Sequence, residues 1–128
     1  MERTIRSFND LECWKKCKEL RQEIAALIKT FPDFEKYELI SQMRRASRST
    51  TNNIAEGYGR FHHKENAQFC RISRGSLYEL LDHLDIALEE QYIDKIKFDN
   101  LSLLTVNCIK ILNGYINYLV RIQKANMP

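Results

Sequence analysis

The chain has 128 residues, a length typical of one globular domain with a single buried core. Hydrophobic residues make up 44% of it and charged residues 29%, while 4 glycines and 2 prolines are too few turn residues for an all-β fold. The net charge of +3 is too small by itself to indicate nucleic-acid binding. No apolar run approaches the roughly 20 residues of a membrane span, and the N-terminus lacks the apolar segment of a signal peptide. A cytoplasmic protein is expected, with no membrane contact.

The first predicted element is a helix over residues 9–31. Apolar residues recur there at steps of three and four from Leu11 onward, which is the spacing of an amphipathic helix. Asn9 or Asp10 is expected to cap its start, and Pro32 to end it.

The second predicted helix covers residues 34–58. It includes most of the stretch SRSTTNNIAEGYGR, whose serines, threonines and asparagines are unusual in a helix interior. Apolar positions nevertheless continue at helical spacing through Ile54 to Phe61, so the helix is predicted to continue through the stretch. Gly57 or Gly59 suits a left-handed cap at its end.

Two further helices are predicted, over residues 63–91 and 97–124. In the first of them Ile72 and His83 fall on the apolar face, and Gly75 lies in the middle, where glycine costs about 1 kcal/mol relative to alanine. A close helix crossing at Gly75 is the expected reason. Apolar positions of the last helix span nearly half its circumference, wider than the roughly 100° stripe of a simple surface helix. This width favours a second partner surface and therefore a homo-oligomer.

Four helices with short connections predict an all-α fold, an antiparallel up-down-up-down four-helix bundle that forms one domain over residues 1–128. No catalytic residue, metal site or cofactor is predicted. The cysteines are expected to be free thiols, because Cys13 and Cys17 share a helical turn but no second ligand pair completes a zinc site. We therefore expect a protein that is not an enzyme.

An arginine cluster is the most informative surface feature. Arg44, Arg45 and Arg48 precede or begin the polar stretch and Arg60 ends it. Arginine pairs equally well with phosphate and with carboxylate. Two interpretations therefore remain: a solvated stripe that also makes subunit contacts, or a nucleic-acid-binding patch.

The sequence resembles the small four-helix-bundle proteins encoded by intervening sequences in 23S ribosomal RNA genes, often described as ribosomal-protein-like. These are related to the accessory variability protein of diversity-generating retroelements. The residues that carry the resemblance are Phe31, Pro32, Gln42, Arg44, Arg45, Ala46, Ser49, Asn53, Ile54, Ala55, Glu56, Gly57, Gly59, Arg60, Gly75, Ser76, Leu77, Glu79 and Leu80. One departure is the run Thr50, Thr51 and Asn52, where the family usually has an apolar residue or proline.

The resemblance implies a bacterial homopentamer without known catalytic residues, and it adds a reverse transcriptase as a possible partner. The leading hypothesis is an oligomeric protein that binds structured RNA, or RNA and DNA, through a basic surface. The alternative is an adaptor or scaffold whose polar stripe contacts a subunit or partner. The residues expected to make subunit or structural contacts are Ser49, Asn53, Glu56, Gly57, Gly75, Ser76 and Glu79.

Overall fold

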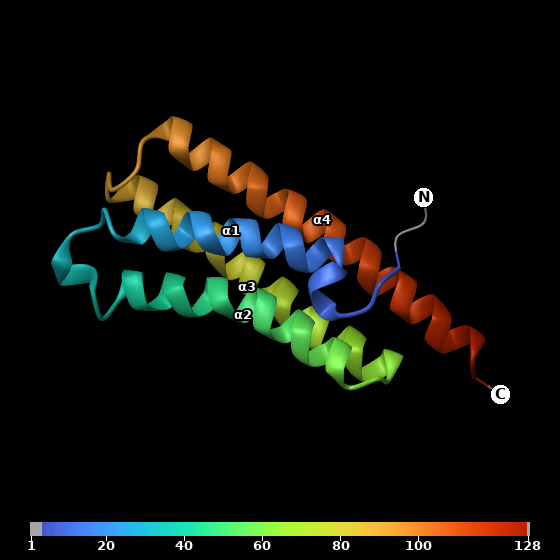
Figure 1. Cartoon of the computed structure of the whole chain (residues 1–128). Coiled ribbons are helices and arrows are strands. Elements are labelled where there is room, and N and C mark those ends of the chain that lie inside the picture. Colours follow the sequence, from blue (N-terminus) through green and yellow to red (C-terminus); the bar gives the residue numbers. More distant parts are fainter. Residues whose placement is uncertain (1–3, 128) are drawn as a thin grey trace.

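The computed structural model describes residues 4–127 and is an antiparallel bundle (Figure 1). Its helices are α1 (Glu12–Ile28), α2 (Leu39–Gly59), α3 (His63–Glu89) and α4 (Lys95–Ala125), with the short 3-10 turns η1 (Phe8–Asp10) and η2 (Asp33–Glu35). Successive helices run in opposite directions. The predicted all-α up-down-up-down bundle is confirmed.

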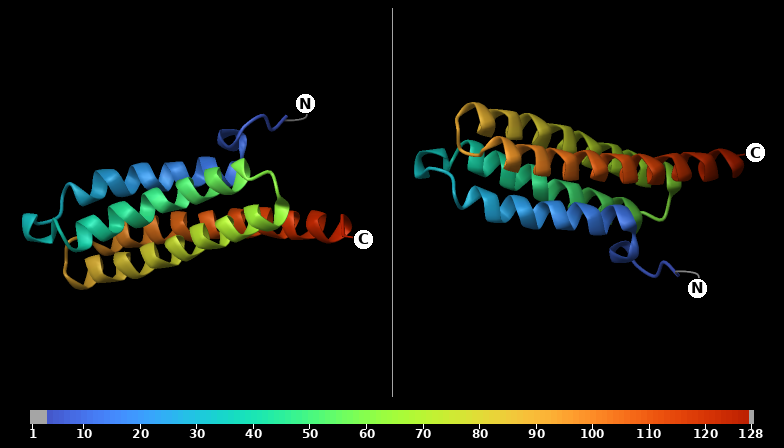
Figure 2. Two further views of the ribbon diagram at one scale, coloured as in Figure 1. Left: turned by 90° about the horizontal axis from the view of Figure 1, so that it is seen from below. Right: turned by 90° about the horizontal axis from the view of Figure 1, so that it is seen from above.

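Each helix packs against two neighbours: α1 and α3 both contact α2 and α4, and the most extensive interface joins α2 to α3. One apolar core extends along the bundle axis, and its fully buried side chains include Leu20, Ile24, Met43, Ile54, Leu77, Leu80, Leu84, Leu112 and Leu119. Helix α4 has 31 residues, about 46 Å at 1.5 Å per residue, against 17 residues for α1. Its C-terminal end therefore projects beyond the other helices (Figure 2).

Helix α1 is shorter at both ends than its pattern predicted. The Asp10 carboxylate does not cap α1, because it accepts hydrogen bonds from the amides of Arg6 and Ser7 at 2.9 and 3.2 Å and so closes turn η1. The first of these bonds is the main reason that the pKa of Asp10 lies below its usual value. At the other end Thr30 donates its hydroxyl to the Leu27 carbonyl at 2.7 Å, so α1 ends at Ile28 before Pro32 is reached.

Helix α2 begins at Leu39, five residues later than predicted, because turn η2 and a non-helical Glu38 (φ −118°, ψ −105°) intervene. Its end also differs from the prediction. No described glycine has a positive φ. The chain reverses instead through Phe61, at φ 60°, so the expected glycine cap is wrong. The ring of Phe61 is 86% exposed rather than part of the core.

The ends of the last two helices also shift by about two residues. Helix α3 ends at Glu89, and Gln91 takes the left-handed conformation (φ 62°) that turns the chain toward α4. Asp94 then caps α4 by accepting from the Lys97 amide at 2.8 Å. Ile72 is 53% exposed, so its assignment to the core of α3 is wrong. None of the described helices combines the length and apolar content needed to cross a bilayer.

Candidate nucleic-acid interface

The serines and asparagines of the polar stretch are used mainly inside the protomer. The Ser76 hydroxyl of α3 donates to Ser49 Oγ of α2 at 2.8 Å, and Asn53 donates to both oxygens of Ser49 at 2.9 Å. One turn away, the fully buried Ser73 donates to the Thr50 carbonyl at 2.8 Å. The stretch therefore fastens α2 to α3 instead of presenting all its polar groups outward.

A glycine allows the closest approach of these two helices, but it is Gly57 and not Gly75. A Cβ built on Gly57 would lie 2.7 Å from Asn66 Oδ1 and 2.9 Å from the Phe69 Cβ. A Cβ on Gly75 would meet no atom of residues 4–127 within 4 Å, so the close crossing expected there is wrong. The two glycines therefore have different roles.

Two of the four predicted arginines are already paired with carboxylates. Arg45 lies 3.6 Å from the Glu79 carboxylate, which also lies within hydrogen-bond distance of His83 Nε2, at 3.0 Å. Arg60 lies 3.2 Å from Glu56 and 3.8 Å from Glu65, and its guanidinium rests 4.9 Å from the centre of the Phe69 ring. Such exposed pairs stabilise little, yet they reduce the positive charge available to a ligand.

The other two arginines, Arg44 and Arg48, line a groove of about 590 Å³ between α1 and α2. Helix α1 contributes Arg21 and, at its C-terminal end, Lys29. Arg21 is held in place because its Nη1 donates to Thr51 Oγ1 of α2 at 2.8 Å. We call these four residues the basic groove.

The basic groove is electrostatically uncompensated. Its other lining residues are polar or aliphatic, and none is a carboxylate. Within residues 4–127, no carboxylate forms an ion pair with any of its four cations. A second hollow of about 590 Å³ along α2 shares Arg44, Arg48 and Asn52 with it, and that hollow is also lined by Glu56, which pairs with Arg60. Guanidinium forks with amide and hydroxyl groups nearby are suited to bind phosphate oxygens.

Sequence reasoning found the α2 half of this groove and missed the α1 half. Arg21 and Lys29 lie more than ten residues before Arg44, and only the antiparallel pairing of α1 with α2 brings them together. A signal was present, because Arg21, Ala25 and Lys29 follow one another at steps of four on one face of α1. This spacing is a weaker signal than Arg44, Arg45 and Arg48, which lie within five residues of one another.

The described residues offer no metal centre, since no three His, Cys, Asp or Glu side chains of residues 4–127 group to hold an ion. The four cysteines are free and buried, as predicted. Burial raises the pKa of Cys13 and of Cys70 to about 12. Contact with the Cys17 thiol, together with burial, raises the pKa of Cys108. These thiols are therefore neutral core groups at physiological pH.

The fold and the groove define a class: a small all-helical bundle protein with an uncompensated basic channel between two adjacent helices. A family model described as 23S rRNA-intervening sequence protein matches residues 9–114. The chain belongs to this family. No curated protein matches the sequence.

One solved structure gives the same fold. It is a crystal structure of a protein of unknown function from the S23 ribosomal protein family of Bacteroides thetaiotaomicron. The TM-score is 0.76 at 19% sequence identity, over 82% of this chain and 95% of that one. The likeness supports the bundle architecture.

Proposed function

We propose that this protein binds RNA through the basic groove and is not an enzyme. The observation that carries the proposal is the convergence of Arg21, Lys29, Arg44 and Arg48 on one groove without a carboxylate in its lining. Phosphate contacts supply most of the affinity of a protein that binds nucleic acid without reading base edges. Membership in a family named for its rRNA-gene intervening sequences supports RNA as the natural polyanion to test first.

The groove also explains how binding is compatible with a net charge of only +3. The carboxylates Glu56, Glu65 and Glu79 lie on α2 and α3 and pair with Arg60 and Arg45. The lining of the basic groove itself has four cations and no carboxylate. Such a local field attracts phosphate even when the whole molecule is nearly neutral.

Fluorescence anisotropy with a fluorescein-labelled RNA hairpin tests the proposal. The double variant Arg44→Gln, Arg48→Gln removes two cations from the basic groove and keeps the side chains polar. Arg71→Gln is the matched control, because Arg71 is an exposed arginine on α3 that bonds only to Gln68 among the described residues. We expect the double variant to bind the hairpin at least about tenfold more weakly and the control to bind as wild type. Equal binding by all three proteins would reject the basic groove.

A second proposal concerns assembly. Four apolar side chains of α4 lie on one exposed face of the helix: Ile96 is 73%, Leu103 61%, Ile111 37% and Tyr118 48% exposed. We call them the α4 stripe. We propose that the stripe packs against other copies of this chain, because monomers rarely leave so long an apolar row in water. A homopentamer is the state that we expect. If the protein is instead an adaptor, its partner would bind the surface that stays exposed after the copies of the chain have assembled.

A further inference from the structure

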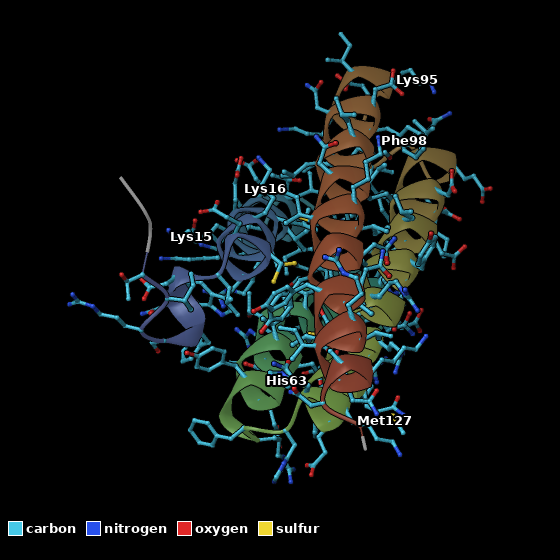
Figure 3. The ribbon with its side chains drawn as sticks, turned by 90° about the vertical axis from the view of Figure 1, so that its right-hand side faces the viewer. Lys15, Lys16, His63, Lys95, Phe98 and Met127 are labelled. Carbon is cyan, nitrogen blue, oxygen red and sulfur yellow. The ribbon has the colours of Figure 1, made fainter. Side chains whose placement is uncertain are left out.

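Another hollow, separate from the two along α2, lies at the opposite end of the bundle from the α1–α2 connection. Its volume is about 500 Å³, and it forms where the turn between α2 and α3 meets the C-terminal half of α4. Four aromatic rings line it: Tyr58, Phe61, Tyr115 and Tyr118. Two histidines, His62 and His63, complete the side formed by the turn, and Figure 3 shows His63 close to α4. Tyr118 also belongs to the α4 stripe, but neither the basic groove nor the stripe accounts for Tyr58, Phe61 and Tyr115.

Phe61 is the most unusual of these residues. Its φ of 60° is in the left-handed region, where a residue with a side chain is strained and where glycine or asparagine is favoured. Its ring contributes nothing to the core, because it is 86% exposed. The fold therefore combines a strained backbone and an exposed aromatic ring at one position, and backbone strain of this kind is found at ligand sites.

The inner wall of the hollow carries the Tyr115 hydroxyl, which one hydrogen bond holds in place. Asn66, which is 7% exposed, donates from Nδ2 to the Tyr115 hydroxyl oxygen at 3.0 Å. In this bond the Tyr115 oxygen is the acceptor, so the hydroxyl can still donate its own hydrogen. No described residue accepts that hydrogen. Burial raises the pKa of Tyr115 to about 12, so the hydroxyl keeps this hydrogen at neutral pH.

One arginine lies next to the hollow. Arg121 lies one helical turn beyond Tyr118 and shares with it a shallow adjoining depression. No carboxylate lines the hollow or the depression. An anionic group attached to a planar ring would therefore find a cation beside the aromatic surface.

We propose that this hollow binds a nucleobase with its attached phosphate. The base stacks on Phe61, the Tyr115 hydroxyl donates to an acceptor on the base edge, and the phosphate lies toward Arg121. Aromatic side chains bind bases of any sequence in this way, since every base has a π-face. The base can belong to a free nucleotide or to an unpaired position in RNA, and the second source rests on the function proposed above.

The test compares Phe61→Asn with Phe61→Tyr. Asparagine tolerates the left-handed backbone and removes the ring, whereas tyrosine keeps the ring. Binding of AMP, with inorganic phosphate as the control probe, is followed by NMR chemical shifts of the wild type and both variants. We expect saturable AMP binding that Phe61→Asn weakens at least about fivefold and Phe61→Tyr retains, with weaker binding of phosphate alone. Thermal melting of Phe61→Asn at or above the wild-type temperature shows that the fold is intact.

Two results would overturn the proposal: AMP binding that Phe61→Asn leaves unchanged, or no saturable AMP binding by the wild type. In the second case a lower sedimenting mass of Phe61→Asn would assign the ring to a contact between copies of the chain.

A second arm uses a labelled single-stranded oligoadenylate and a fully paired RNA duplex. If Phe61→Asn weakens single-strand binding but not duplex binding, the base comes from RNA. If only AMP binding responds, the ligand is a free nucleotide. The two proposals fail separately: a wild-type protein that binds AMP but no RNA supports the hollow and rejects the proposed function, whereas RNA binding without saturable AMP binding rejects the hollow alone.

Discussion

At the scale of single residues, Gly57 determines how closely α2 approaches α3. Alanine there would bring a methyl group within 3.0 Å of Asn66 and of Phe69. The contact with Asn66 Oδ1 can relax by rotation of that side chain. The Phe69 Cβ at 2.9 Å and the Asn66 backbone oxygen at 3.0 Å can move away only if α3 itself shifts. The interface between α2 and α3 therefore requires a residue without a side chain.

We predict that Gly57→Ala lowers the free energy of unfolding by about 1–3 kcal/mol through overpacking. Gly75→Ala is the matched control, since its methyl group meets no described atom and alanine is favoured in a helix. The control should raise the free energy of unfolding by about 0.4–1 kcal/mol. Urea unfolding followed by circular dichroism measures both, and a Gly57→Ala protein as stable as wild type would show that the helices can separate without cost.

The buried thiols make a second prediction at this scale. The pKa values of Cys13 and Cys70 are raised to about 12 from the ordinary 9.0, with burial as the first cause. Below pH 9 these thiols are protonated in both the folded and the unfolded chain, and their full contribution to stability is present. As pH rises toward 12, the unfolded chain loses its thiol protons first, which lowers the free energy of unfolding. We therefore expect the urea midpoint to fall between pH 9 and 11.

The double variant Cys13→Ala, Cys70→Ala should show a smaller fall over the same range. Thiol reagents give an independent readout. At pH 8 the cysteines of the folded chain should react slowly, whereas all 4 cysteines of the unfolded chain should react quickly. Rapid reaction in the folded state would mean that the helices open at these positions.

At the scale of the elements, polar groups hold α2 against α3. Ser49 and Ser76 share a hydrogen bond at 2.8 Å, and Asn53 holds Ser49 in place at 2.9 Å. These are directional contacts, and the bond from Ser73 to the Thr50 carbonyl at 2.8 Å adds a third one between the same helices. They fix the register of the two helices.

A double-mutant cycle with Ser49→Ala and Ser76→Ala tests this interface. We expect each single variant to lose about 1 kcal/mol, because each removes one partner of a partly buried hydrogen bond. The pair should lose less than the sum of the two, since both changes remove the same bond. Strictly additive losses would show that the two hydroxyls do not interact.

Much of the element structure could be predicted from sequence, for a physical reason. The interior of each helix is set by apolar spacing, so all four helices and most of the core were predicted. Helix ends depend on local hydrogen bonds that spacing does not reveal, such as Thr30 to Leu27 at the end of α1. Phe61 was placed in the core because it continued the apolar period, but the helix ends two residues before it.

The candidate site was harder to predict than the fold. Arg44 and Arg48 were recognised on α2, but Arg45 and Arg60 prove to be paired with carboxylates of α2 and α3. Arg21 and Lys29 were missed, because a groove between helices depends on which faces meet after folding. The sequence shows charges along the chain, and only the bundle shows which of them remain uncompensated.

At the scale of the whole molecule, the α4 stripe is the feature that a monomer does not explain. We predict that Leu103→Lys reduces the mass measured by sedimentation equilibrium, because it places a charge in the row of apolar contacts. Tyr78→Lys on α3 is the control, since Tyr78 is 57% exposed and lies outside the stripe. A wild-type protein that sediments as a monomer would reject assembly. An unchanged mass for Leu103→Lys would show that the copies of the chain contact each other outside the α4 stripe.

The central claim is that the basic groove contacts phosphates, and the salt dependence of RNA binding tests it most directly. Affinity for the RNA hairpin is measured between low and moderate salt for the wild type, for Arg44→Gln, Arg48→Gln, and for the Arg71→Gln control. Each lost phosphate contact lowers the slope of log affinity against log salt by about 0.7–0.9. We expect a slope reduced by about 1.4–1.8 in the double variant and unchanged in the control. Binding that is absent at low salt, or a slope that is the same in all three proteins, would contradict it.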